Sequence, residues 1–213
     1  MARVTVLGGT GYAGSRIARE LAARGHAVTT VSRTVPERAS EGVRHVAGSV
    51  LDRDFLERVV AGDVVVSALA PRGELAGEVR GVLRDVAALA QRKGVRLGVV
   101  GGAGSLRVSE DGPRLLDTEA FPEEFKPEAQ EAAEVLEDLR GADEALDWFY
   151  VSPAAGFGAF APGERTGSYR TGGDVLLTDE AGVSSISGDD FAIAVADEVE
   201  RAAHRRRRFT VAH

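Results

Sequence analysis

Residues 2–34 read ARVTVLGGTGYAGSRIARELAARGHAVTTVSRT, and this stretch decides the fold. A Val-rich run, Arg3–Leu7, ends in a cluster of glycines. Apolar residues at helical spacing follow, and a second apolar run, Ala27–Ser32, closes the stretch. Both runs have the length and composition of buried strands, and the segment between them has the period of an amphipathic helix. The stretch therefore predicts a strand–helix–strand unit with parallel strands.

The glycines between the first strand and the helix have a spacing that suits a bound diphosphate. Gly8, Gly11 and Gly14 form G-x-x-G-x-x-G, and counting from Gly9 gives G-x-G-x-x-G. One glycine permits a sharp turn, one lets the main chain approach a pyrophosphate, and one lets the helix pack on the strand. The free N–H groups at the helix start then face the phosphates. The turn predicts dinucleotide binding, and a purely structural glycine turn is the alternative.

Three further residues of this turn are candidate coenzyme ligands. Thr10 offers a hydroxyl donor, and Tyr12 and Ala13 offer main-chain N–H groups. No Lys-Ser/Thr pair follows the glycines, which excludes a P-loop of the nucleoside-triphosphate type.

The end of the second strand indicates which coenzyme binds. An acidic residue there would accept a hydrogen bond from the ribose 2′-hydroxyl of NAD(H) and repel a 2′-phosphate. This chain has Ser32 and Arg33, with Arg38 a little beyond. A guanidinium pairs with a phosphate through two parallel N–H bonds. We therefore predict NADP(H) in preference to NAD(H); the alternative is that Arg33 is an ordinary surface residue.

Short apolar runs alternate with helical segments through the rest of the chain. Their nearly continuous hydrophobicity suits a parallel sheet covered on both faces, and the alternation implies right-handed crossovers. The predicted fold class is α/β: a Rossmann-type doubly wound parallel sheet with helices on both faces and a small C-terminal substrate-side appendage. We expect residues 1–213 to form a single NAD(P)-binding domain. The expected strands are Arg3–Leu7, Ala27–Ser32, Val43–Val46, Asp63–Leu69, Arg96–Val100, Asp147–Val151 and a last strand, FTVAH, at 209–213.

The composition changes at Pro153. Residues 153–188 are rich in glycine and should form loops and short strands over the carboxyl edge of the sheet, where open α/β sheets bind ligands. A last helix is expected from Asp190 to about Ala203, with Ser187 or Asp189 as its N-cap. Five side chains of the glycine-rich region are candidates for contact with an acceptor, with loop packing as the alternative: Phe157, Phe160, Arg165, Tyr169 and Arg170.

Composition and charge exclude several classes of function. No run approaches the roughly 18 apolar residues of a membrane span, and the first residues do not read as a signal peptide. The chain has no cysteine, four scattered histidines and a net charge of -7, so we expect no disulfide, no metal site and no broad nucleic-acid surface. The basic run HRRRRF at 204–209 is interpreted as a solvated helix end. We expect a cytoplasmic protein, monomer or homodimer, that binds neither nucleic acid nor membrane.

Six segments resemble the atypical short-chain dehydrogenases, most closely the NmrA-like and NADH–flavin reductase branch that includes biliverdin reductase B-type flavin reductases. They are VLGGTGYAGSRI, VSR, DVVVSALAP, LGVVGGAGSL, LDWFYVSPA and SISGDDFAIAVADEVE. The resemblance covers nearly the whole chain, and the first segment is the most specific.

The resemblance implies roles for residues that follow later strands. Relatives often carry Gly-Asp before the third helix, with the acid near the adenine, whereas this chain has Gly48, Ser49 and Val50. Ser49 or the Val50 main chain would make that contact instead. The other implied coenzyme contacts are Ser67, Ala68, Leu69 and Ala70 along the adenosine and ribose, Gly101 and Gly102 near the nicotinamide, and Ser152 and Pro153 closing over it.

The chain lacks the proton donor of the classical members. They use Tyr-x-x-x-Lys, in which tyrosine protonates the substrate oxygen. None of the three tyrosines here has Lys four residues on, and Phe125 and Ala129 occupy the corresponding positions. Ser105 lies where a catalytic serine would and is the one candidate catalytic residue, with a turn role as the alternative.

The absence of this proton donor limits the kinds of acceptor that the protein could reduce. Reduction of a carbonyl creates an alkoxide that needs a proton donor, whereas a reduced flavin or quinone delocalises its charge and takes protons from solvent. We therefore predict an NADPH-dependent oxidoreductase that passes hydride to a flavin or quinone-like acceptor. One alternative is a non-catalytic NADP(H)-binding redox sensor of the NmrA type. Another is a nucleotide-sugar epimerase or dehydratase, which would need the tyrosine and a larger substrate domain.

Overall fold

The computed structural model of the chain describes residues 1–36 and 40–213. One sheet runs through it in the order β3-β2-β1-β4-β5-β6-β8-β7, and every neighbouring pair is parallel except β7 and β8. In chain order the elements are β1 (Arg3–Leu7), α1 (Tyr12–Ala23), β2 (Ala27–Ser32), β3 (Val43–Ala47), α2 (Arg53–Val59), β4 (Val64–Ser67), the 3-10 helix η1 (Gly73–Leu75), α3 (Val79–Lys93), β5 (Arg96–Val100), η2 (Leu115–Asp117), η3 (Glu123–Phe125), α4 (Lys126–Arg140), β6 (Trp148–Ser152), β7 (Arg170–Gly172), α5 (Gly188–Arg201) and β8 (Arg207–Ala212).

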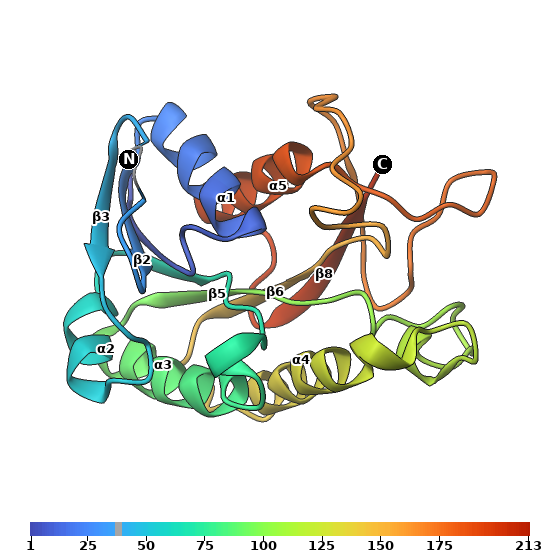
Figure 1. Cartoon of the computed structure of the whole chain (residues 1–213), viewed down its shortest axis with the longest axis horizontal. Coiled ribbons are helices and arrows are strands. Elements are labelled where there is room, and N and C mark those ends of the chain that lie inside the picture. Colours follow the sequence, from blue (N-terminus) through green and yellow to red (C-terminus); the bar gives the residue numbers. More distant parts are fainter. Residues whose placement is uncertain (37–39) are drawn as a thin grey trace.

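The helices form two layers, one on each face of the sheet (Figure 1). α1 and α5 pack together on one face, and α2, α3 and α4 cover the other. The chain leaves β1 toward β2 and β3 and then returns to place β4 on the other side of β1. This reversal creates the switch point, beside the carboxyl ends of β1 and β4, at which doubly wound sheets bind their ligands. The predicted α/β fold class is confirmed.

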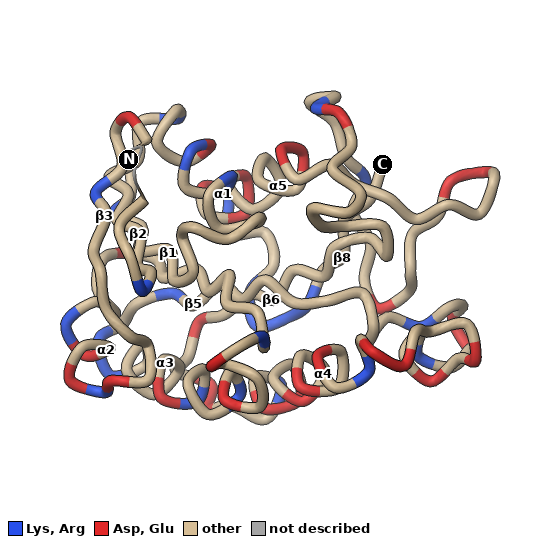
Figure 2. Tube along the Cα trace, in the orientation of Figure 1, with Lys and Arg blue, Asp and Glu red and all other residues tan. Residues whose placement is uncertain are grey.

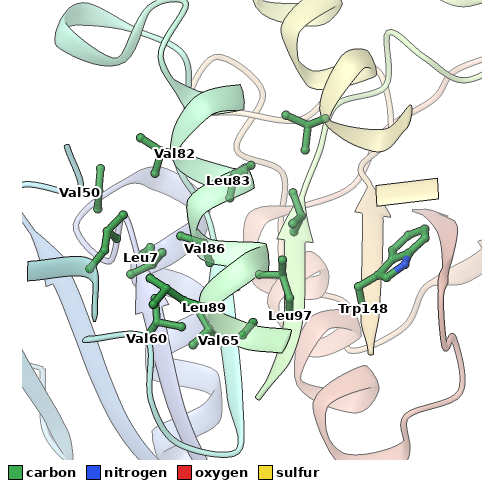
Figure 3. Close-up of a cluster of buried hydrophobic side chains, with 14 of the residues drawn as sticks. Leu7, Val50, Val60, Val65, Val82, Leu83, Val86, Leu89, Leu97 and Trp148 are labelled. Carbon is green, nitrogen blue, oxygen red and sulfur yellow. The ribbon is translucent and has the colours of Figure 1, made fainter. Parts of the chain in front are cut away.

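Both faces of the sheet are buried, which explains the continuous valine runs. In β4, Val64 and Val66 face the layer of α1 and α5, whereas Val65 faces α3. Figure 3 shows the second of these cores, where strand residues such as Leu7 and Leu97 lie opposite side chains of α3. Each fully buried side chain of this kind contributes on the order of 1.5–3 kcal/mol.

Helix ends follow the expected signals. Gly94 caps α3 in the left-handed conformation, at φ 63°, and Gly25 has φ 83° just after α1. Of the two residues proposed as the N-cap of the last helix, Ser187 is the cap: its hydroxyl accepts a hydrogen bond from the Asp190 N–H at 3.0 Å. α5 therefore begins at Gly188, two residues before the expected start.

The largest difference from expectation concerns the last strand. We predicted 209–213, whereas β8 begins at Arg207 and includes two arginines of the basic run. Arg208 is buried because Asp174 and Ser105 accept its hydrogen bonds. A charge run that looked like a solvated helix end thus lies partly inside the sheet. β1, β2 and β5 have the predicted bounds, whereas the ends of β3, β4 and β6 differ by one or two residues, with β4 ending at Ser67 instead of Leu69.

Charged residues lie mostly in the helices and loops (Figure 2). α3 and α4 are joined by Arg80 and Arg84, which both bond to the Asp138 carboxylate. Among the described residues no helix is long and apolar enough to cross a bilayer.

The glycine-rich region is tied to α5 through one buried carboxylate. Asp190 accepts hydrogen bonds from the N–H groups of Thr166 and Gly167 at 2.8 and 2.7 Å and from the Ser187 hydroxyl at 2.7 Å. The ring of His213 lies 2.9 Å away. Burial acts to raise the pKa of Asp190, but the hydrogen bonds outweigh it and hold that pKa at about 2.

Removing this carboxylate should destabilise the protein. Asp190→Ala leaves the buried Ser187 hydroxyl and the N–H groups of Thr166 and Gly167 without their acceptor, and we expect the free energy of unfolding in urea to fall by about 2–4 kcal/mol. Because the folded pKa is depressed, the contribution is present above about pH 4 and is lost as the pH falls toward 2. Asp189→Ala is the matched control, since its exposed carboxylate makes only long ion pairs of 3.5 and 3.6 Å. Equal losses in the two variants would contradict this role.

Candidate active site

The glycine turn joins β1 to α1 and leaves the start of the helix uncapped. Gly8 has φ +81°, and a Cβ there would lie 2.7 Å from the Ala68 carbonyl oxygen. A Cβ on Gly14 would lie 2.3 Å from the carbonyl oxygen of Gly8, so these two glycines permit close packing. Gly11 is the N-cap of α1, and no side chain satisfies the first N–H groups of the helix. Such a helix end attracts an anion.

Gly11 differs from its neighbours because open space lies beside it. Its main chain is exposed, and a Cβ would meet only the Gly8 carbonyl oxygen, at 3.3 Å. Thr10, also exposed, leaves its hydroxyl at the same surface. The bare main chain around Gly11 fits a diphosphate, as the motif requires.

The residues after β2 face those after β4. Arg33 Nη1 lies 3.1 Å from Glu74 Oε2 in η1, and both side chains are about 70% exposed, at 69% and 71%. The Ser32 hydroxyl donates to the Thr34 carbonyl at 2.7 Å. Arg38 lies outside the described residues.

The predicted adenosine path divides into exposed and buried residues. Ser49 is exposed, and its hydroxyl accepts the Leu51 N–H, whereas the Val50 side chain is part of the core beside α3. Ser67 is buried at the end of β4, and the Ala68 N–H donates to the Leu7 carbonyl at 2.8 Å. That bond brings the segment 67–70 against the glycine turn.

The predicted nicotinamide end is built on Tyr150. A Cβ on Gly101 would lie 2.0 Å from the Tyr150 ring, so only glycine fits there. The Tyr150 hydroxyl donates to the Ala132 carbonyl at 3.0 Å. Ser152 and Pro153 are buried, and the Ser152 hydroxyl has no hydrogen-bond partner among the described residues. Ser152 is 0% exposed, so its hydroxyl lies beneath the surface at the carboxyl end of β6.

These segments meet because their strands are neighbours. Residues 8–14, 32–33, 67–70, 101–102 and 152–153 follow the carboxyl ends of β1, β2, β4, β5 and β6, and Ser49 and Val50 follow β3. The bare turn at this edge of the sheet fits the diphosphate of a nicotinamide dinucleotide. The individual contacts stay predictions.

No tyrosine is placed as a proton donor. Burial raises the pKa of Tyr150 to about 12. Burial and the 2.7 Å bond to Asp197 raise the pKa of Tyr169 well above its usual range. The Tyr12 hydroxyl lies 3.3 Å from the Pro162 carbonyl. Phe125, where the classical tyrosine would be, precedes α4 and is partly exposed.

Tyr12 has a role that the motif did not indicate. Its ring packs edge-on against Phe157, with centroids 5.4 Å apart, and Arg16 covers it at 4.0 Å. Together with the bond to Pro162, these contacts tie the glycine-rich region to the glycine turn. The sequence carried no signal for this side-chain role, because motif residues at this position contribute their main chain.

Most of the candidate acceptor contacts are engaged in packing. Phe157 lies between Tyr12 and Phe191. Arg165 pairs with Glu20, and Arg170 donates to the carbonyls of Thr178 and His213. Phe160 is different, with 74% of its surface exposed.

Ser105 has a partner that the sequence did not reveal. Arg208 Nη1 donates to its hydroxyl at 2.8 Å, which fastens the loop after β5 to β8. The catalytic role stays a prediction, and the bond supplies a structural reason for a serine at this position.

A substitution separates these two roles. For Ser105→Ala we expect a loss of about 0.5–1.5 kcal/mol in the free energy of unfolding, because Arg208 loses one acceptor. The dissociation constant for coenzyme should stay within about twofold and the reduction rate within about threefold, each well under one tenfold step of about 1.4 kcal/mol. Ser109→Ala, in the same loop and exposed, is the control. A rate loss of about 100-fold, or roughly 2.7 kcal/mol, with normal coenzyme affinity would make Ser105 catalytic.

No group of three or more His, Asp or Glu side chains that would hold a metal ion occurs among residues 1–36 and 40–213.

Known proteins share both the sequence and the fold. A protein of Burkholderia pseudomallei, described as a "putative exported protein", is 40% identical over all of both chains, with a TM-score of 0.86. A "putative NADH-flavin reductase" of Streptococcus pneumoniae is 33% identical over all of both chains, with a TM-score of 0.84. A "putative epimerase" of Bacteroides thetaiotaomicron is 32% identical over 99% of this chain and 96% of its own, with a TM-score of 0.89.

The family assignment rests on most of the chain. Residues 8–202 match the family described as NAD(P)H-binding, and this range begins at the first glycine of the turn. The chain therefore belongs to the NAD(P)H-binding family and has the fold of the atypical short-chain dehydrogenases/reductases.

Proposed function

We propose that this protein is an NADPH-dependent reductase that passes hydride to a flavin or a quinone-like acceptor. The observation that carries the proposal is the pairing of a well-formed glycine turn with three tyrosine hydroxyls that are all engaged elsewhere. An acceptor whose reduced form is stable without an enzyme-supplied proton suits such a site. The similar Streptococcus pneumoniae protein, named for flavin reduction, supports the same class of acceptor.

In this proposal the residues of the chain bind the coenzyme and orient it toward the acceptor. The main chain at Gly11, Tyr12 and Ala13 holds the diphosphate at the start of α1. The main chain at Gly101 and Gly102, held by Tyr150, supports the reacting end of the coenzyme. When bound, the reduced nicotinamide supplies the hydride. Orientation of two reactants, more than acid–base chemistry, then accounts for the rate.

The coenzyme preference rests on Arg33. Its guanidinium is exposed at the end of β2, where an acid would select NAD(H). Glu74 is its present partner, and an exposed pair of this kind contributes only about 0–1 kcal/mol. A 2′-phosphate is a doubly charged competitor for the same guanidinium. We propose NADP(H) on this basis.

One set of assays tests the proposal. Binding of NADPH, NADP⁺ and NADH is measured first, and NADPH oxidation is then followed with FMN, riboflavin, a quinone and an aldehyde, with the enzyme-free rate subtracted. We expect turnover with a flavin or the quinone and none with the aldehyde. Turnover only with the aldehyde would contradict the proposal.

A non-catalytic NADP(H) sensor is the second candidate. The absence of an available tyrosine favours it as much as it favours the reductase. Binding of both NADPH and NADP⁺ without turnover on any acceptor would identify the sensor.

An epimerase is the third candidate, supported by the name of the similar Bacteroides thetaiotaomicron protein. Epimerases of this superfamily depend on the tyrosine that is replaced by Phe125 here. Conversion of a nucleotide sugar without net coenzyme oxidation would favour it.

The compartment and the assembly are part of the proposal. A reductase that draws on the NADPH pool would act in the cytoplasm, as a monomer or homodimer. Because the similar Burkholderia pseudomallei protein is described as exported, cell fractionation is the deciding measurement.

A further inference from the structure

A cavity lies at the opposite edge of the sheet from the glycine turn. Its volume is about 470 Å³, within the range of small-molecule sites. Trp148 and Arg207, which line it, are the first residues of β6 and β8, and Arg140 is the last residue of α4. The glycine turn follows the last residue of β1, so the cavity belongs to the amino edge of the parallel strands. The cavity therefore lies away from the predicted coenzyme site, and Arg208 is the lining residue that also reaches the loop after β5, through its bond to Ser105.

The lining of this cavity carries more positive than negative charge. Four arginines contribute to it, whereas Asp174 is the only carboxylate among its lining residues. Asp174 is shared, because both Arg140 and Arg208 bond to it. Arg140 also pairs with Glu137 at 2.8 Å, so Arg140 and Arg208 each have a carboxylate partner.

The other two arginines have no carboxylate partner among the described residues. Arg206 donates only to main-chain carbonyls, those of Ala142, Asp143 and Leu146. Arg207 is exposed, and its side chain makes no hydrogen bond or ion pair to the part of the chain that the structure describes. Figure 2 shows the arginine run where β8 begins. The positive charges of Arg206 and Arg207 are therefore not compensated by any carboxylate of residues 1–36 and 40–213.

The cavity wall also holds a polar group without a partner. The Trp148 side chain is 1% exposed, and its indole N–H has no acceptor among residues 1–36 and 40–213. A buried donor without an acceptor carries a desolvation cost of roughly 1–3 kcal/mol. An oxygen-rich ligand would supply acceptors beside uncompensated guanidinium groups.

We propose that this cavity is a binding site for a small oxyanion, a phosphate or polycarboxylate group of two or more negative charges. Guanidinium groups bind both through charge-assisted hydrogen bonds. The short arginine run of an otherwise acidic chain then has a function within the fold. The site does not depend on the proposed reductase activity.

The only tryptophan of the chain gives a direct probe, because Trp148 lines the cavity. The protein is saturated with NADP⁺ so that the coenzyme site does not take up the added anion. Inorganic phosphate and citrate are titrated in separate arms at constant ionic strength, with chloride as the reference salt, while tryptophan emission is recorded. We expect a saturable change with phosphate or citrate and none with chloride.

Matched variants locate the binding. Arg140→Gln/Arg207→Gln removes two charges from the cavity and should weaken the apparent affinity at least tenfold. Arg44→Gln/Arg92→Gln removes two exposed arginines that make no ion pair with a described residue, and should change it less than twofold. Arg207→Glu is a single variant that reverses the charge of this residue, and it should weaken phosphate binding more than removal of the two charges does. Circular dichroism checks that each variant is folded.

Two outcomes would overturn the proposal: an emission change that follows ionic strength alike for chloride and phosphate, or equal losses in the two double variants. The titration is repeated in Gly11→Val without coenzyme, where the bare turn is filled by a side chain. We expect the same phosphate response in this variant. That outcome supports the anion site whether or not the protein binds NADP⁺.

Discussion

Replacing Gly11 by valine is expected to weaken binding of NADPH and NADH by at least about 100-fold, or roughly 2.7 kcal/mol, while leaving the protein folded. The main chain of Gly11 has φ -71° and ψ 171°, which any residue adopts. A Cβ would lie 3.3 Å from the Gly8 carbonyl oxygen, a tight contact that a small shift of the turn relieves, and no other atom lies within 4 Å outside the adjacent residues. The added methyl groups instead occupy the open space above the turn, where the motif places the diphosphate.

Comparison with two other glycines makes this result specific. Gly81→Ala is the control for a harmless substitution, because no atom lies within 4 Å of its Cβ position in α3 and alanine favours a helix. Gly14→Val should destabilise the whole protein, since its Cβ would lie 2.3 Å from the Gly8 carbonyl oxygen. Coenzyme affinity is measured by calorimetry and folding by thermal melting. A Gly11→Val protein that binds NADPH as the wild type does would place the coenzyme elsewhere.

The sequence was sufficient for the parts of the fold that depend on local pattern. Residues 3–33 show strand period, glycine turn and helix period in one continuous stretch, and both strands have the predicted bounds. Ser187 was recognisable as a helix cap because capping involves residues only three apart. The doubly wound parallel sheet followed from the alternation of strands and helices, whereas the order of its strands came from the structure.

The features that were not predictable depend on contacts between distant residues. Ser105 acquires its partner from Arg208, more than one hundred positions away. Asp190 forms hydrogen bonds with Thr166 and His213, which lie 24 and 23 positions away in the sequence. No helix or strand period relates residues at such separations. The same reason explains the error at β8, where Asp174 makes a buried arginine acceptable. Local sequence patterns contain no information on such long-range pairs. The side-chain contacts of the site were therefore found only in the structure.

Arg33→Asp should reverse the coenzyme preference. The wild-type guanidinium attracts the 2′-phosphate, whereas a carboxylate there repels it and accepts a hydrogen bond from a free ribose 2′-hydroxyl. Glu74, now 3.1 Å from Arg33, would add a second negative charge on the same side. We expect the NADPH dissociation constant to rise by about 30–100-fold, roughly 2–2.7 kcal/mol, while that of NADH changes less than about threefold.

Glu74→Gln gives the complementary measurement, because it frees Arg33 without removing it. NADPH should then bind equally well or up to about threefold more tightly, in keeping with the small free energy of an exposed pair. Arg92→Asp is the charge-matched control at an exposed site on α3 and should not alter either affinity. The preference of the wild type for NADPH should also decline with added salt, since Arg33 is exposed and the interaction is screened. If NADH bound to the wild type as tightly as NADPH, and Arg33→Asp changed neither constant, Arg33 would be an ordinary surface residue and the coenzyme would be chosen by other contacts.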